Sequence, residues 1–505
     1  MTRRVALMMM TSLVAAAPVM AQNAPVAPAA MRAAPAERRA ETHHAGTFAG
    51  QALRYTAVVE DNIVPAADGT PGASIVTTAY LREGVKDVRR RPVLFAFNGG
   101  PGAGSAMLNT KALGPMIRAE EPAGAAPTMA GASTAPLVAN ADSVLDAVDL
   151  VFVDPVGTGV SRALPGVDAK QYYNADADVR SVQQAIAHWL KVHRREASPR
   201  YVMGESYGTV RAGLLMRDRA ALRFDGVMLV ALVGRTPGPD LPFITALPTM
   251  AAGRWFHRPD TRDGKSVRQV YDEAVAFAQT DYASALIRGG SMAAGEREAM
   301  ARRVAAMIGV DPALVLANAL RVPKNVWMFN LLKDRGLRTG LLDVRVTAPL
   351  PADQEGDGAL DDPALAVVPT GAKKDGKPFN PADVGPVPNP VFGAHLTHDL
   401  KFPTQDIYYA VNFSANAAWK HDPTIDAVRP VADAMRADPK LRLFWTAGVY
   451  DLTTPAYEAR YGLDQAGIPA ERLTAEIFDG PHGVYEGVAN RAKFAAAVRG
   501  FVALR

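Results

Sequence analysis

The stretch Gly204-Glu205-Ser206-Tyr207-Gly208 decides the fold of this chain. It lies between an apolar run typical of a strand, Tyr201-Val202-Met203, and an apolar helical stretch that begins near Thr209. A serine between two glycines at a strand-to-helix reversal predicts a nucleophile elbow. The glycines permit the sharp turn, and the hydroxyl is held out at the carboxyl edge of a sheet. The pattern occurs once in the chain, since residues 289–293 come closest but end in alanine.

Patterns typical of strands and helices alternate on both sides of this pentapeptide. Apolar strand patterns lie at residues 92–97, 149–153, 226–232, 441–447 and 473–478, and helical patterns at residues 177–193 and 489–504. Residues 54–59 and 74–80 predict an antiparallel hairpin at a sheet edge, joined across Asp68-Gly69. The alternation predicts an α/β protein with a mostly parallel, doubly wound sheet.

Between about residues 235 and 438 the alternation gives way to helical patterns and proline-rich loops, which predicts an inserted, mainly helical cap. The chain is therefore expected to divide into a signal peptide (1–21), a flexible Ala/Pro-rich tether (22–46), a first core part (47–234), the cap (235–438) and a second core part (439–505). The tether contains His43-His44, which we attribute to solvent-exposed composition rather than to a metal site.

The first residues resemble a secretory signal, with basic Arg3-Arg4, an apolar middle and a small-residue end at Ala21. An uncleaved membrane anchor is the alternative, although Pro18 and the short apolar run disfavour a stable membrane span. The double arginine alone is weak evidence for a twin-arginine signal. We expect a periplasmic or secreted protein.

Composition excludes several classes of function. The 505 residues include 55 basic and 51 acidic ones, so the formal charge is only +4 and no nucleic-acid partner is expected. There is no cysteine, which excludes a thiolate nucleophile, a cysteine zinc site and any disulfide. No metal-ligand spacing such as His-Glu-x-x-His occurs, and no metal or cofactor is expected.

A serine nucleophile needs a base beside it and a carboxylate that orients the base. Asp451 follows the strand pattern at 441–447, and His482 follows the one at 473–478. The chain order Ser206, Asp451, His482 is that of an α/β-hydrolase triad. Asp451 would otherwise cap the next helix, and His482 would be a surface loop residue. Their joint position after predicted strands favours the triad.

The glycine loop at residues 98–102 allows three interpretations. A phosphate loop would need lysine where Ser105 stands, and the dinucleotide pattern fails because residue 107 is not glycine. A plain turn would need fewer glycines. The third is an oxyanion hole, in which glycine lets a backbone amide approach a developing alkoxide and the amide of Tyr207 is the second donor.

The glycine loop, the motif at residues 154–161, the pentapeptide around Ser206, Asp451 and the His482 loop together resemble the serine carboxypeptidase family of the α/β-hydrolase superfamily, in a bacterial-type exported form. The resemblance extends from about residue 91 to the C-terminus. It implies an α/β-hydrolase fold and peptide substrates, with oxyanion amides at Gly100 and Tyr207. It also implies that Asn98, with the adjacent Gly99, and Glu205 bind the terminal carboxylate of the substrate.

A glutamate repels a substrate carboxylate when ionised but shares a proton with it when neutral. An enzyme with this arrangement should favour acidic conditions on free-acid substrates. Glu205 would otherwise be a buried residue bonded to nearby backbone, and Asn98 a turn residue. The chain departs from the family at Ala96, Ala103 and Gly483, where tryptophan, cysteine and methionine are usual, which puts the side-chain preference in doubt.

We therefore expect a serine carboxypeptidase that acts through an acyl-enzyme. The alternatives are an esterase or acyltransferase with the same triad, and a catalytically silent binding protein on this fold. The sequence does not specify the oligomeric state.

Overall fold

The computed structural model describes residues 34–120, 135–351, 360, 362–365, 367–368 and 372–504. The predicted signal peptide at residues 1–21 and the first part of the predicted tether, residues 22–33, lie outside the described residues.

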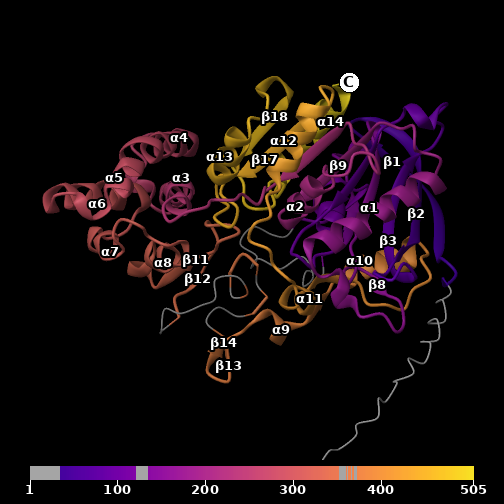
Figure 1. Cartoon of the computed structure of the whole chain (residues 1–505), viewed down its shortest axis with the longest axis horizontal. Coiled ribbons are helices and arrows are strands. Elements are labelled where there is room, and N and C mark those ends of the chain that lie inside the picture. Colours follow the sequence, from indigo (N-terminus) through magenta and orange to yellow (C-terminus); the bar gives the residue numbers. More distant parts are fainter. Residues whose placement is uncertain are drawn as a thin grey trace, which may run out of the picture.

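A central sheet runs in the order β1-β2-β3-β7-β4-β9-β10-β17-β18, with β8 paired to β3 (Figure 1). Its strands are β1 (Arg39–Phe48), β2 (Gln51–Pro65), β3 (Pro71–Arg82), β4 (Val93–Phe97), β7 (Asp149–Asp154), β8 (Arg162–Ala163), β9 (Arg200–Glu205), β10 (Gly226–Val230), β17 (Arg442–Gly448) and β18 (Leu473–Phe478). Neighbours from β7 to β18 are parallel, whereas β1, β2 and β3 are antiparallel. The predicted mostly parallel sheet and the antiparallel hairpin of β2 and β3 are confirmed, but β1, and not the hairpin, forms the edge of the sheet.

Helices cover both faces of this sheet. One apolar cluster joins one face to helices α1 (Ala175–Val192), α2 (Tyr207–Leu214), α12 (Val428–Ala437) and α13 (Ala456–Ala466), and a second joins the opposite face to α14 (Val488–Ala503). Side chains of β4 alternate between the two clusters, with Phe95 in the first and Leu94 in the second. This is why the central strands are apolar without interruption. None of the helices in the described ranges is long and apolar enough to cross a membrane.

The insertion between β10 and β17 begins with helices that lie to one side of the sheet (Figure 1). They are α3 (Leu241–His257), α4 (Val267–Phe277), α5 (Ala283–Arg288), α6 (Ala294–Ile308), α7 (Pro312–Ala317) and α8 (Lys324–Asn330). Buried aromatic residues hold them together, among them Trp327, whose indole N–H donates to Ile308 O at 2.8 Å.

The later part of the insertion packs against the core. It contains β11 (Leu337–Thr339), β12 (Thr347–Pro349), β13 (Lys373–Lys374), β14 (Lys377–Pro378), α9 (Pro381–Val384), β15 (Pro386–Pro388), α10 (Pro390–Ala394), β16 (Tyr409–Asn412) and α11 (Phe413–Ala417). Asn412 N donates to Gly102 O at 2.7 Å, and Gly104 N donates to Ala410 O at 2.9 Å. Helix α12, which the predicted boundary at residue 438 assigns to the cap, packs against α2 and α13 of the core.

The predicted tether is wrong over residues 39–46, which belong to β1 and pair antiparallel with β2. Composition conceals this strand because a backbone ladder holds it and only one of its faces meets protein. His44 stacks on Tyr55 with ring centroids 5.3 Å apart, and His43 Nδ1 lies 2.7 Å from Glu83 Oε1. The paired histidines are therefore strand residues.

Candidate active site

Ser206 occupies the predicted turn between β9 and α2. Its backbone has φ 58° and ψ −129°, a strained conformation for a residue with a side chain. A Cβ at Gly204 would lie 2.0 Å from Gly208 O, and one at Gly208 would lie 2.8 Å from Phe97 O. Both glycines are therefore required by close backbone approach, as the pentapeptide pattern predicts.

Asp451 and His482 meet at the same edge of the sheet, in the loops after β17 and β18. Nδ1 of His482 lies 2.8 Å from Oδ2 of Asp451. The same Oδ2 accepts the Thr454 hydroxyl at 2.5 Å, while Oδ1 accepts the backbone N–H groups of Thr453 and Thr454 at 2.9 and 3.1 Å. The carboxylate is fully buried, and each of its two oxygens accepts two hydrogen bonds.

The charges of this pair support each other. Burial alone would raise the pKa of Asp451, but the charge and hydrogen bond of His482 and the Thr454 donors outweigh burial and lower it. Burial disfavours the imidazolium of His482, but Asp451, and then Glu205 and Glu486, raise its pKa. Asp451 is thus an ionised orienting group for the imidazole, with Nδ1–H as the donor.

A short segment of the insertion braces both loops. Leu452 N donates to Leu341 O, and His482 N donates to Leu342 O, each at 2.8 Å. The N–H groups of Leu341 and Leu342 in turn donate to Asp362 Oδ2, each at 3.0 Å. One buried carboxylate therefore positions the strap that ties the acid loop to the imidazole loop.

The glycine loop lies directly against the start of α2. A Cβ at Gly99 would be 2.4 Å from Tyr207 N, and Gly100 has φ +98°. Among the described residues, the N–H groups of Gly100 and Tyr207 donate no backbone hydrogen bond. Two unused donors close to the turn at Ser206 are what an oxyanion hole requires.

Glu205 and Asn98, the predicted carboxylate-binding pair, share a partner that the sequence did not indicate. Tyr485 donates its hydroxyl to Glu205 Oε2 at 2.7 Å, and the Asn98 side chain lowers the pKa of Tyr485 as a hydrogen-bond donor. Asn98 Oδ1 accepts Leu108 N at 3.0 Å. Glu205 is 2% exposed, and burial raises its pKa to about 7 against the opposing effects of His482 and Tyr485.

Arg211 is a second residue that sequence reasoning missed. It is 1% exposed, and its Nε lies 2.9 Å from Asp178 Oδ2. Its Nη1 donates to Asn98 O at 3.0 Å. The guanidinium therefore ties the glycine loop to α2. The one available signal was a charged residue inside an otherwise apolar helical stretch.

The motif at residues 154–161 holds the segment that follows the glycine loop. Asp154 Oδ1 accepts Ser105 N at 2.7 Å and the Tyr408 hydroxyl at 3.0 Å. Burial raises the pKa of Asp154 to about 6. Ser161 closes the motif by donating to Asp154 O at 2.7 Å. The motif therefore stabilises the structure around the site.

The structure brings Asp451 and His482 into contact and places Glu205, the neighbour of Ser206, under the influence of the His482 charge. Ser206 itself forms no side-chain hydrogen bond with His482 among the described residues, so the serine–imidazole contact stays a prediction. Catalytic hydrogen bonds commonly tighten only when substrate binds. The described residues include no cluster of three or more His, Asp or Glu side chains arranged to hold a metal ion.

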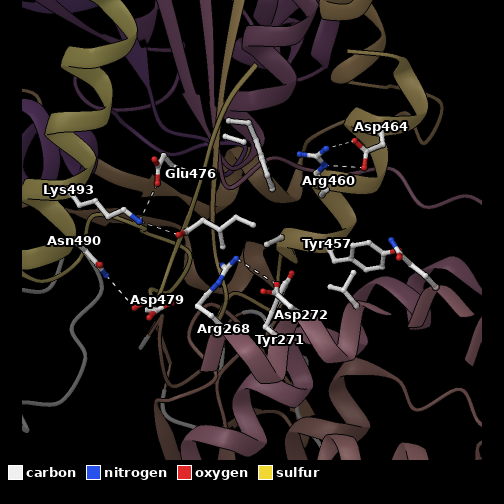
Figure 2. A pocket seen from close by; sticks show the side chains of 16 residues that line it. Arg268, Tyr271, Asp272, Tyr457, Arg460, Asp464, Glu476, Asp479, Asn490 and Lys493 are labelled. Carbon is white, nitrogen blue, oxygen red and sulfur yellow. Dashed lines mark hydrogen bonds and ion pairs between the residues drawn. The ribbon is translucent and has the colours of Figure 1, made fainter. Parts of the chain in front are cut away.

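A separate cleft of about 760 Å³ lies between α4, α13, β18 and α14 (Figure 2). Its basic side chains pair with acidic ones inside the cleft. The pairs are Arg268–Asp272 (3.8 Å), Arg460–Asp464 (2.9 Å) and Lys493–Glu476 (3.2 Å). None of the predicted site residues lines it.

A strand–serine–helix turn at the carboxyl edge of a mostly parallel sheet, with acid and imidazole loops after the last two strands, defines the α/β-hydrolase fold. The family resemblance expected from the motifs is confirmed, since residues 80–214 match the model of the serine carboxypeptidase family. The matched segment contains the glycine loop and the turn at Ser206. The fold is thus that of α/β-hydrolases, and the segment around the glycine loop and Ser206 is similar to serine carboxypeptidases.

The solved structure of a yeast carboxypeptidase agrees with this fold. Kex1(delta)p, a prohormone-processing carboxypeptidase from Saccharomyces cerevisiae, is similar over 88% of this chain and 90% of its own, with 12% identity and a TM-score of 0.51. A thermostable carboxyl esterase from Bacillus coagulans is similar over 88% of this chain and 98% of its own, with 9% identity and a TM-score of 0.35. A comparison with curated protein sequences gave no match.

Proposed function

We propose that this protein is a serine-type carboxypeptidase that releases C-terminal residues from peptides at mildly acidic pH. The observation that carries the proposal is the Glu205 carboxyl, which is buried immediately before Ser206 and has a pKa raised to about 7. Such a carboxyl holds a proton under mildly acidic conditions. The match of residues 80–214 to the serine carboxypeptidase family supports the same activity.

In the first half of the reaction, Ser206 Oγ attacks the carbonyl carbon of the last peptide bond and its proton passes to His482 Nε2. The carbonyl oxygen becomes an alkoxide, which the N–H groups of Gly100 and Tyr207 bind. The C–N bond then breaks, and His482 gives its proton to the leaving amine. An ester between Ser206 and the shortened peptide remains.

In the second half, His482 removes a proton from water, which attacks the same ester carbon. Collapse of the second tetrahedral intermediate returns the proton to Ser206 Oγ and frees the peptide acid. Asp451 keeps the imidazole oriented through the Nδ1 hydrogen bond of 2.8 Å in both halves.

Exopeptidase preference comes from Asn98 and Glu205. Asn98 offers an amide N–H to the terminal carboxylate of the substrate, and neutral Glu205 shares its proton with that carboxylate. Above the pKa of Glu205 two carboxylates would face each other, and binding of free-acid peptides would weaken.

The proton on Glu205 has a second effect on the same site. The negative charge of Glu205 is one of the causes that raise the pKa of His482. When Glu205 is protonated this cause disappears, and the imidazole regains part of its ability to act as a base. A protonated Glu205 thus favours both substrate binding and proton transfer.

The test compares a blocked dipeptide with its C-terminal amide across pH 4–8, with Ser206→Ala as control. The expected result is faster cleavage of the free acid at acidic pH, and no cleavage or fluorophosphonate labelling in the variant. Mass spectrometry of digested peptides should show stepwise loss from C-termini. Equal rates on acid and amide would contradict the carboxylate-binding role and favour an esterase or acyltransferase. Absence of labelling in the unaltered protein would favour a silent binding protein.

Export to the periplasm or medium belongs to the same proposal, and the basic and apolar N-terminal residues support it. Cell fractionation with N-terminal sequencing of the mature chain tests it. Retention of Met1 in a cytoplasmic fraction would contradict it.

A further inference from the structure

We infer that Tyr485 is a positioning residue that determines which oxygen of Glu205 carries the proton offered to the substrate. The inference rests on the proposed function, since it assigns a new residue to the proposed carboxylate-binding site. It starts from two hydrogen bonds, from Leu108 N to Asn98 Oδ1 and from the Tyr485 hydroxyl to Glu205 Oε2.

The hydroxyl of Tyr485 is held in a fixed place. Its side chain is fully buried, and its ring packs against Phe494 with centroids 5.6 Å apart. The turn in which Glu486 N donates to Gly483 O at 2.9 Å brings the ring back under the site only three residues after His482. The hydroxyl then reaches Glu205 Oε2 at 2.7 Å.

The backbone fixes the donor and acceptor atoms of Asn98. Leu108 N is a donor only, so the Asn98 atom that faces it at 3.0 Å is the carbonyl oxygen Oδ1. The Asn98 amide group is therefore left as a donor, and as a donor it lowers the pKa of Tyr485. Tyr485 in turn donates its own hydrogen to Glu205 Oε2.

This direction assigns the proton of neutral Glu205. Oε2 already accepts a hydrogen, and a proton there would meet the hydroxyl hydrogen of Tyr485 head-on. Tyr485 does not yield its hydrogen, because burial and then the charge of Glu205 raise its pKa well above the ordinary value. The proton therefore sits on Oε1, which has no partner among the described residues and is the oxygen left for a ligand.

The charged groups that face Glu205 set the pH at which this proton is lost. After burial, which raises the pKa of Glu205, His482 lowers it, Tyr485 lowers it through its hydrogen bond, Glu486 raises it and Lys111 lowers it. His482, Tyr485 and Glu486 lie on one loop, and Lys111 lies opposite, 3.3 Å from Glu486. Removing only the Tyr485 hydroxyl takes one donor from the ionised form, so the pKa of Glu205 rises.

The test uses Tyr485→Phe, with Tyr282→Phe as the matched control, because Tyr282 is also buried and donates its hydroxyl to Leu320 O at 2.7 Å in the insertion. At pH 5 we expect Tyr485→Phe to raise KM for the free-acid dipeptide about tenfold, with kcat within about twofold, and to leave both constants for a C-terminal ester nearly unchanged. The upper limb of the free-acid pH profile should move up by about one pH unit. Tyr282→Phe should change none of these.

Infrared titration of the Glu205 carboxyl band, assigned with Glu205→Gln in a Ser206→Ala background, gives a readout that needs no peptidase activity. The expected result is a higher pKa of Glu205 in Tyr485→Phe. Replacement of Tyr485 by 3-fluorotyrosine, a stronger donor of nearly the same shape, should lower that pKa. An unchanged carboxyl titration in both proteins, or an equal rise of KM for acid and ester, would overturn the inference. Failure of the unaltered enzyme to prefer acid over amide would instead contradict the proposed function, and the infrared result would still decide the role of Tyr485.

Discussion

Two buried carboxyl groups act on the charge of His482, and they differ in ionisation at mildly acidic pH. Asp451, in the loop after β17, is fully buried with a lowered pKa, whereas Glu205, at the end of β9, is 2% exposed with a pKa raised to about 7. Asp451 accepts hydrogen bonds from Thr453 N, from the N–H and hydroxyl of Thr454, and from His482. Among the described residues Glu205 accepts one, from Tyr485. At equal depth, the adjacent charge of His482 and then the larger supply of donors keep Asp451 ionised.

The difference suits two duties that a single carboxyl would not perform at one pH. An acid that orients an imidazole must stay ionised throughout the reaction, and an acid that binds a carboxylate must stay neutral. The fold provides both by placing one acid in a loop whose N–H and hydroxyl groups donate to it and the other at the end of an apolar strand.

The largest test of the comparison replaces the ionised acid. Asp451→Asn keeps the shape but removes the charge that orients Nδ1–H of His482, and we expect kcat on an ester substrate to fall by about 10⁴-fold. Glu205→Gln, measured on the same ester with no free carboxylate, should stay within a fewfold of the unaltered enzyme. A loss of less than tenfold in Asp451→Asn would mean that His482 does not depend on Asp451.

Removing one donor from the Asp451 side should make the two sites more alike. Thr454→Val deletes the hydroxyl that lies 2.5 Å from Asp451 Oδ2, which should reduce the free energy of unfolding by about 1.5–3 kcal/mol and raise the pKa of Asp451. Thr454→Ser retains a hydroxyl and is the control. Urea unfolding at pH 7 measures the free energy of unfolding of the two variants. Equal values for Thr454→Val and Thr454→Ser would show that the hydroxyl contributes nothing to stability.

The pH dependence of stability tests the Glu205 side. The folded pKa of about 7 lies above the ordinary 4.5, so the folded chain holds a proton that the unfolded chain has lost. Stability from this group is therefore present below pH 4.5 and decreases as pH rises through 7, by about 2 kcal/mol between pH 5 and 7. Glu205→Gln should lose this decrease. Urea unfolding at pH 5 and pH 7 measures the decrease. If Glu205→Gln loses as much stability between these pH values as the unaltered protein does, a group other than Glu205 titrates.

The smallest effect is expected at the rim of the site. Glu486 is exposed and pairs with Lys111 at 3.3 Å, so Glu486→Gln should change the free energy of unfolding by less than about 1 kcal/mol. Because the Glu486 charge raises the pKa of Glu205, its removal should move the free-acid pH limit slightly downward. If the pH limit moved upward instead, Glu486 would lower the pKa of Glu205, which contradicts the assigned effect.

The sequence was sufficient to predict those parts of the fold and of the site that depend on local patterns. The glycines at 204 and 208 and the apolar strands are local signals, and they located Ser206, Asp451 and His482 at one edge of a parallel sheet. The contact of Asp451 with His482 followed from chain order and strand position.

It was insufficient where contacts are distant or made by backbone. Tyr485 is 280 residues from Glu205, and nothing in Gly483-Val484-Tyr485 indicates that the ring turns back under the site. The strap at Leu341 and Leu342 acts through main-chain groups, which leave no side-chain pattern. β1 was missed for the same reason.

That strap has a consequence for anyone who would exchange the insertion for another. The helices α3 to α8 lie to one side of the sheet, yet the chain that follows them ties together the loops of the acid and the imidazole. A chimaera that takes its whole insertion from a relative would gain new substrate contacts. It would also lose the strap, and the loops of Asp451 and His482 would no longer be aligned. The transferred segment should therefore end before residue 340. This chain then keeps its own Leu341, Leu342 and Asp362, and with them the hydrogen bonds to both loops.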